Sequence, residues 1–286
     1  MSTIKLKVNK QLTDRAAEKL KTKFVDESHY DTLIDYDCDA FDAYGNLLFK
    51  FRKNIFPQNI LECGYNSFKK SIVKNVGRGV AAGGYDTSGK FDISPEVTSG
   101  NVGYMDARPG NLDYCRLTSF GREYFDDFQN GIPFVEHVDY LYSKLCPDHY
   151  KKQKTIANAT NRNFIIGNTA FTTVTVNQTF RTAVHKDSGD YRDGFGNLIV
   201  FNDGSYDGGY FVLPQYKIAI DVQSNDVLFV DVHQWHGNTE MKLRDGFDEI
   251  FRISFVLYYR ENMFKCKQPS EQLKKLKIRK NGYLTL

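Results

Sequence analysis

The chain has 286 residues, of which 41% are hydrophobic and 26% charged, and its 38 Lys and Arg against 35 Asp and Glu give a formal net charge of +3. These values are typical of a globular protein and exclude a disordered, collagenous or coiled-coil chain. No run of 18 apolar residues is present, so no membrane-spanning helix is expected. The mildly basic balance is compatible with nucleic-acid binding but does not require it.

The cysteines are few, scattered and odd in number, and no CxxC pair is present. They are Cys38, Cys63, Cys115, Cys146 and Cys266. This usage argues against a disulfide framework and a cysteine zinc site, and it fits a reducing compartment. The first seven residues, MSTIKLK, lack the apolar core of a signal peptide. We therefore expect an intracellular protein of the cytoplasm or nucleus that is not secreted.

Two elements are predicted near the N-terminus. Residues 12–24 indicate a helix, because Thr13 is a suitable N-cap and apolar residues follow at helical spacing. Residues 32–53 indicate a β-hairpin, because the turn residues Tyr44-Gly45-Asn46 separate two β-rich runs.

A segment rich in Gly and Ser extends from Gly77 to Gly110. Loops of this length inside compact domains are either functional lids or disordered segments, and both readings stay open. Arg78, Arg108 and Tyr104 give the segment cationic and aromatic groups that could contact a ligand.

The rest of the chain divides into a helical part, a β-rich part and a basic end. One helical face carries Phe134, Val138 and Leu145 and ends before Pro147. From residue 164 to residue 260 short β-rich runs alternate with Gly, Asn and Asp, which predicts an antiparallel sandwich or small barrel. Residues 274–280 (KKLKIRK) predict a solvated amphipathic end, with phosphate contact as the alternative.

The segment from Val174 to Asp190 carries the first chemically informative residues. Interpreted as a strand, it places side chains two apart on one face. His185 and Asp187 then project the same way and can reach one ion, and the same parity places Asn177 and Arg181 on that face.

A third ligand is expected from the sequence DVHQWHGNT, which follows an apolar strand at residues 227–230 and supplies His233 and His236. Two His and one carboxylate suit non-haem Fe(II) and leave positions open for a co-substrate and oxygen. Zinc hydrolases use a similar ligand set, so the ligands alone do not decide the metal. The HG context favours His236, with His233 as the alternative.

Sixteen residues beyond His236 comes RISFVLYYR, in which Arg252 and Ser254 share one strand face. A buried Arg needs a partner, because an unpaired charge in the interior is costly, and a bidentate carboxylate is the natural one. A dicarboxylic keto acid could chelate the metal at one end and meet Arg252 and Ser254 at the other.

The combined pattern of HxD, a distal His in an HG context and Arg-x-Ser resembles the Fe(II)/2-oxoglutarate-dependent dioxygenases. Within them, RTAVHKDSGD, GGYFVLPQY and DVHQWHGNT are similar to the TET/JBP branch, and to its thymine-hydroxylating J-binding-protein group in particular. The resemblance is strong over residues 164–259. It is weaker in the N-terminal half, where RGVAAG and SGNVGY look like the substrate-facing region of that group.

The resemblance implies a role for individual residues. His185, Asp187 and His236 match the iron ligands. Arg252 matches the Arg that binds the distal carboxylate of 2-oxoglutarate, with Ser254 beside it. The implied cofactors are Fe(II), 2-oxoglutarate as co-substrate, and O2. Asn177 and Arg181 are assigned to the same pocket from strand parity alone.

The implied fold is α+β, with a double-stranded β-helix (jelly-roll, cupin-like) core, flanking N-terminal helices and a hairpin. We expect a single dioxygenase domain over residues 1–286. Its parts are an N-terminal substrate-facing region at 1–155, the β-helix core with the iron site at 156–262, and a basic tail at 263–286.

The implied activity is hydroxylation of the methyl group of a 5-methylpyrimidine in DNA, first thymine to 5-hydroxymethyluracil and second 5-methylcytosine. The alternative is a 2-oxoglutarate-dependent hydroxylase of a protein side chain or small molecule. DNA and the small co-substrate are the expected partners, without a membrane, and the oligomeric state stays open. Trp235 either packs or stacks on a base, and Asp190 either accepts from a ligand histidine or is a solvated turn residue.

Overall fold

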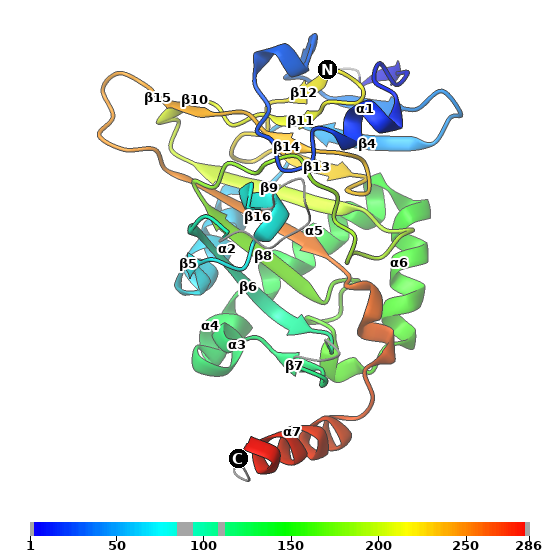
Figure 1. Ribbon diagram of the computed structural model, residues 1–286, viewed down its shortest axis with the longest axis vertical. Coiled ribbons are helices and arrows are strands. Elements are labelled where there is room, and N and C mark those ends of the chain that lie inside the picture. Colours follow the sequence, from blue (N-terminus) through cyan, green and yellow to red (C-terminus); the bar gives the residue numbers. More distant parts are fainter. Residues whose placement is uncertain (1–2, 85–93, 108–111, 284–286) are drawn as a thin grey trace.

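Two β-sheets of unequal size form the centre of the molecule (Figure 1). The computed structural model describes residues 3–84, 94–107 and 112–283. Within them, the large sheet has the strand order β1-β3-β4-β13-β9-β16-β8-β6-β5, with β7 paired to β6. Its strands are β1 (Ile4–Lys7), β3 (Cys38–Phe41), β4 (Leu47–Arg52), β5 (Val73–Asn75), β6 (Val97–Met105), β7 (Arg116–Leu117), β8 (Thr173–Gln178), β9 (Gly196–Asn202), β13 (Val227–Val230) and β16 (Arg252–Tyr258).

The smaller sheet has the order β14-β11-β12-β2, and a separate pair joins β10 to β15. Their bounds are β2 (Thr32–Ile34), β10 (Tyr206–Gly208), β11 (Phe211–Leu213), β12 (Ile218–Ile220), β14 (Gly237–Asn238) and β15 (Met241–Leu243). Apart from the parallel pairs β1/β3 and β2/β12, the strands of both sheets are antiparallel.

Strand alternation divides the core into two layers. In β13, Val227 and Phe229 join the apolar cluster beneath the helices, whereas Leu228 and Val230 join the cluster between the two sheets. Successive side chains of a strand point to opposite faces, so a fully apolar strand of this kind is buried on both sides. The α+β jelly-roll fold predicted from the sequence is confirmed.

Helices cover the face of the large sheet that points away from the smaller sheet (Figure 1). Phe134 shows how they attach, because its ring lies 4.9 Å from that of Phe255 in β16. The helices that pack on this face are α2 (Gln58–Phe68), α3 (Ser119–Glu123), α4 (Phe125–Asn130), α5 (Ile132–Leu145) and α6 (Pro147–Ala159). Helix α1 (Asp14–Glu18) lies near the smaller sheet, and α7 (Pro269–Tyr283) stands apart at the C-terminal end (Figure 1). Among the described helices, none has the length and apolarity needed to cross a bilayer.

The predicted N-terminal helix is shorter than expected. Thr13 caps it as predicted, since its Oγ1 accepts from the Ala16 N–H at 3.2 Å, but α1 ends at Glu18. The following residues pair instead with the segment that leads to the candidate site: Thr22 N donates to Val184 O and Val184 N donates to Lys23 O. Tertiary pairing therefore overrides the helical periodicity.

The hairpin is confirmed for β3 and β4, which turn at Gly45 with a φ of +87°. β2 lies outside it and pairs in parallel with β12. Helix α5 ends before Pro147 as predicted. That proline then begins α6, a helix the sequence analysis did not identify.

Residues 77–110 do not form one loop. Their second half contains β6, a nine-residue strand inside the large sheet. Tyr104 is half-buried and packs its ring against Phe128 and Phe164 at the edge of the core. Arg108 lies outside the described residues.

The scattered cysteines argued against disulfides, and this prediction is wrong for one pair. Cys115 and Cys266 are bonded to each other. They are 151 residues apart in the chain, and only the fold brings their sulfurs together. The proposed division at residues 155 and 262 stays a prediction.

Candidate functional site

A backbone bridge brings the two histidines of the site together. His185 N donates to His236 O at 2.9 Å, and His236 N donates to His185 O at 3.0 Å. Gly237 permits this close approach, because a Cβ at that position would lie 3.1 Å from the carbonyl oxygen of Thr182. The HG pair noted in the sequence therefore has a steric reason.

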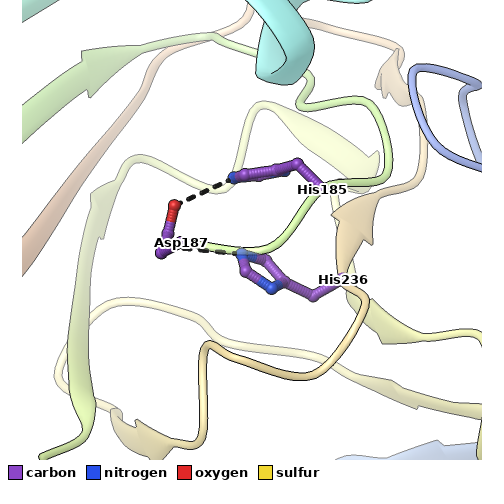
Figure 2. Close-up of side chains that lie close together, drawn as sticks. All are labelled: His185, Asp187 and His236. Carbon is purple, nitrogen blue, oxygen red and sulfur yellow. Dashed lines mark ion pairs between the residues drawn. The ribbon is translucent and has the colours of Figure 1, made fainter. Parts of the chain in front are cut away.

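His185, Asp187 and His236 converge as a compact group, and the three side chains point toward one another (Figure 2). One ligand atom from each lies within 4.8 Å of the others. The distances from Asp187 are 3.4 Å from Oδ1 to Nε2 of His185 and 3.6 Å from Oδ2 to Nε2 of His236. This is the spacing of groups that surround one ion.

Backbone carbonyls orient both rings. Nδ1 of His185 lies 2.8 Å from Ala183 O, and Nδ1 of His236 lies 3.0 Å from Gln234 O. When Nδ1 carries the proton and donates to a carbonyl, Nε2 is left with its lone pair toward the centre of the group. The ring of Phe211 stacks on that of His236 at a centroid distance of 5.1 Å and limits its rotation.

The electrostatic environment favours the metal-binding protonation states of His236 and Asp187 at neutral pH. Burial, followed by the charge of His185, lowers the pKa of His236 to about 4, so its ring is neutral. Burial by itself would raise the pKa of Asp187. The hydrogen bond and charge of His185, with His236 and Arg78, outweigh it and hold the pKa below its usual value. A neutral imidazole and an ionised carboxylate are the forms that bind a cation.

The group opens into a cavity of about 590 Å³. This volume lies in the range of about 300–1,000 Å³ that small-molecule sites occupy. Arg252 and Ser254 line it from β16, and Asn177 lines it from β8. Three neighbouring strands place a polar row there: Ser99 Oγ donates to Asn177 Oδ1 at 2.8 Å, and Asn177 Nδ2 donates to Ser254 Oγ at 3.4 Å.

Arg252 provides a test of whether an anionic co-substrate fits. Its residue is 4% exposed, and its Nε has no hydrogen-bond partner among the described residues. No carboxylate oxygen of the described chain lies within ion-pair distance of it. A buried guanidinium without a partner is costly, so a dicarboxylate that also reaches the His185–Asp187–His236 group fits this cavity.

The donor set also fits the expected metal. Two imidazoles and one carboxylate with open positions are the ligands preferred by non-haem Fe(II). No other group of three His, Cys, Asp or Glu side chains with ligand spacing occurs in the described part of the chain.

His233 lies outside this group. Its Nδ1 is 3.2 Å from Asp231 Oδ1, and its Nε2 is 3.4 Å from Asp190 O. Trp235 lines the cavity, and the ammonium of Lys186 lies 4.9 Å from its ring centroid.

Arg181 is not placed in the cavity with Asn177. β8 ends at Gln178, and Thr179 has a φ of +45°, so strand alternation does not continue to residue 181. The guanidinium of Arg181 donates to Val25 O at 2.8 Å and lies 4.8 Å from the centroid of Phe24.

The structure adds cavity residues that the sequence analysis did not assign. Arg260 lines the cavity and pairs with Asp106, with 2.6 Å from Nε to Oδ1. Asp190, for which the sequence left open a role as acceptor for a ligand histidine or as a solvated turn residue, lines the cavity and forms a backbone bridge with Arg260. Burial and the charge of Asp187 raise its pKa. Ser99, which bonds Asn177 without lining the cavity itself, could have been suspected from its place in the SGNVGY motif. No local pattern marks Arg260 or Lys21.

The chain is similar to known oxygenases in sequence and in fold. The model of the Tet_JBP family, described as the oxygenase domain of the 2OGFeDO superfamily, matches residues 101–261. Thymine dioxygenase JBP1 of Trypanosoma brucei brucei is 30% identical over 280 residues, which cover 96% of this chain and 33% of the relative. The chain thus spans about a third of the length of that relative.

Two further similarities bear on site and fold. A bifunctional helicase and thymine dioxygenase JBP2 of Trypanosoma brucei brucei is 40% identical over 147 residues, 51% of this chain and 13% of the relative. The solved structure of NgTET1 in complex with 5mC DNA superimposes with a TM-score of 0.60 at 16% identity, covering 88% of this chain and 87% of that one. At this identity the structural likeness concerns the fold.

Proposed function

We infer the function of this chain from its family: it belongs to the Tet/JBP family of 2-oxoglutarate- and Fe(II)-dependent oxygenase domains, and we propose that it hydroxylates the methyl group of a 5-methylpyrimidine in DNA. Thymine, converted to 5-hydroxymethyluracil, is the first candidate, and 5-methylcytosine is the second. One oxygen atom of O2 enters the methyl group, the other enters succinate, and 2-oxoglutarate loses CO2.

The observation that carries the proposal is the position of Arg252. Its buried guanidinium has no carboxylate partner among the described residues and lines the same cavity as His185, Asp187 and His236. One molecule of 2-oxoglutarate can therefore meet Arg252 and Ser254 at its far carboxylate while its keto acid reaches the metal.

Each part of the proposed site has a separate task. His185, Asp187 and His236 would hold Fe(II), which supplies oxygen activation when bound with 2-oxoglutarate. Asn177 is held by Ser99 and orients Ser254, so the co-substrate end of the cavity is preorganised. The remaining wall is apolar at Leu198, Val230 and Val256.

A pyrimidine methyl group lies inside the base stack of duplex DNA, so the base must leave the stack or come from a single strand. A cavity of about 590 Å³ beside the proposed metal site suits an extruded base. The relatives are named thymine dioxygenases, and the solved neighbour holds 5mC DNA, which supports DNA as the partner. We expect the chain to act in the compartment that holds this DNA, the nucleus or another intracellular site.

The test is incubation of the purified chain with Fe(II), 2-oxoglutarate and thymine-containing or 5-methylcytosine-containing oligonucleotides, followed by nucleoside mass spectrometry. We expect 5-hydroxymethyluracil from the thymine substrate, no product without 2-oxoglutarate, and no product from Asp187→Ala. Absence of an oxidised base from either DNA would remove the substrate proposal. Succinate release with a peptide or metabolite instead would favour the alternative hydroxylase.

A further inference from the structure

Three cationic side chains from separate parts of the chain line the cavity, of which Lys21 and Lys186 are exposed and Arg78 is half-buried. Lys21 follows α1, Arg78 precedes the 3₁₀ helix η3 (Gly79–Ala82), and Lys186 stands between two members of the proposed metal site. All three line the same cavity as the His185–Asp187–His236 group. We call Lys21, Arg78 and Lys186 the cationic rim.

Backbone hydrogen bonds fix the rim relative to the site. Thr22 N donates to Val184 O at 2.9 Å, which anchors the segment of Lys21. Ala183 N donates to Ala81 O at 2.8 Å, which anchors the segment of Arg78. Both segments therefore attach to the residues immediately before His185, and Lys186 follows it directly.

No carboxylate of the described residues forms an ion pair with the rim. Among the described residues, no carboxylate oxygen lies within 4.0 Å of the charged nitrogens of the three side chains. Asp14 senses the charge of Lys186, but its Oδ1 is already 2.8 Å from the ammonium of Lys10. Arg78 interacts electrostatically with Asp187 and Asp190 inside the cavity without an ion pair, so Lys21 and Lys186 supply the unpaired positive charge there.

Two of the cations are held in place by aromatic rings. The ammonium of Lys186 lies 4.9 Å from the ring centroid of Trp235, and the guanidinium of Arg78 lies 5.8 Å from that of Phe180. Nε of Arg78 is buried and has no hydrogen-bond partner among the described residues. Cations positioned in this way lose less side-chain entropy when they bind an anion.

We propose that the cationic rim binds the sugar-phosphate backbone of a polynucleotide on both sides of the nucleotide whose base enters the cavity. The proposal rests on the proposed function and names the residues that hold the DNA strand. Phosphate contacts position a nucleic acid without reading its sequence, so the rim supplies register and affinity while the cavity selects the base.

The test measures binding separately from chemistry. Fluorescence anisotropy of a labelled single-stranded thymine oligonucleotide over a salt series compares the wild type with Lys21→Gln/Arg78→Gln/Lys186→Gln. Each phosphate contact to a single strand contributes about 0.7 to the slope of log K against log salt concentration, so loss of three contacts lowers the slope by about 2. We expect affinity at low salt to fall at least about tenfold as well.

Matched controls separate the rim from total charge. A triple Lys→Gln variant at exposed positions that do not line the cavity removes the same charge and should keep the wild-type slope; its positions are Lys5, Lys7 and Lys151. If Arg78→Gln disturbs folding, as judged by thermal melting, Lys21→Gln/Lys186→Gln should still lower the slope by about 1.4.

The outcomes distinguish this proposal from the proposed function. If the rim variant keeps the wild-type salt dependence of binding, the rim does not bind phosphates and this proposal is overturned, even if the wild type oxidises DNA. A wild-type slope combined with a raised KM for 2-oxoglutarate would mean that the rim guides the keto acid into the cavity instead. If the rim variant has a weaker salt dependence of binding but the wild type oxidises no base, the rim proposal is supported and the proposed activity is removed.

Discussion

His185 and His236 are 51 residues apart and exchange both backbone hydrogen bonds of one antiparallel bridge. Their rings, with centroids 4.4 Å apart, therefore depend on how closely two chain segments approach. The spacing of the candidate metal-binding groups is therefore set by backbone contact between two distant segments.

The first prediction concerns Gly237. A Cβ there would lie 3.1 Å from Thr182 O and 3.2 Å from backbone atoms of Ala183 and Val184, none of which can rotate away. We expect Gly237→Ala to widen the bridge, to weaken Fe(II) binding about tenfold and to destabilise the fold by about 1–3 kcal/mol. Anaerobic metal titration and thermal melting measure both effects.

Gly189 provides the matched control because it lies in the same loop region as Asp187, yet a Cβ there would meet only the Arg260 guanidinium at 3.9 Å. Gly189→Ala should keep wild-type metal affinity. Equal Fe(II) affinities for Gly237→Ala and wild type would contradict the steric argument.

The second prediction separates the two candidate histidines. His236→Ala should abolish stoichiometric Fe(II) binding, because it removes a member of the group around Asp187. His233→Ala should retain it, because His233 contacts Asp231 and the Asp190 carbonyl instead. Metal content after gel filtration decides between them, and loss of iron from His233→Ala alone would reverse the assignment.

The third prediction concerns the co-substrate. Truncating one partner of a buried charge pair costs about 2–5 kcal/mol, so Arg252→Ala should raise the KM for 2-oxoglutarate by at least about 30-fold with iron affinity nearly unchanged. Steady-state succinate release measures the KM. Arg181→Ala is the control, since its guanidinium contacts Phe24 and Val25 O, and its KM for 2-oxoglutarate should be that of wild type. Identical KM values for Arg252→Ala and wild type would place the co-substrate elsewhere.

The fourth prediction concerns the thiols. Burial raises the pKa of Cys38 to about 11 and that of Cys146 to about 12, whereas Cys63 is partly exposed. Because the thiolate is the reactive form, alkylation of the native protein at pH 8 should modify Cys63 alone. Peptide mapping without reductant should also recover Cys115 joined to Cys266. Modification of Cys38 or Cys146 at the rate of Cys63 would contradict their burial.

The same two thiols give stability a defined pH dependence. Their pKa in the folded state lies above the ordinary value of 9.0, so the folded protein keeps protons that the unfolded chain releases. Their contribution to stability is complete below pH 9 and is lost as the pH rises toward 11–12. The free energy of unfolding, measured with urea, should be lower at pH 10 than at pH 8. The difference between the two pH values should be smaller for Cys146→Ala than for the wild type.

The sequence by itself determined the identity of the chemical groups. HxD, the HG pair and Arg-x-Ser are local patterns, and local spacing is enough to assign residues to a strand face when the strand is regular, as for Arg252 and Ser254 in β16. The same reasoning did not reach Arg181, because Thr179 adopts a positive φ that no neighbouring residue type predicts.

Only the tertiary structure decided which distant groups meet. The convergence of His236 on Asp187, the Cys115–Cys266 bond, and the positions of Lys21, Arg78 and Lys186 around one cavity all depend on contacts between segments far apart in the chain. Such contacts form because burial and hydrogen bonding are satisfied for the whole fold at once, and no short stretch of sequence carries that information.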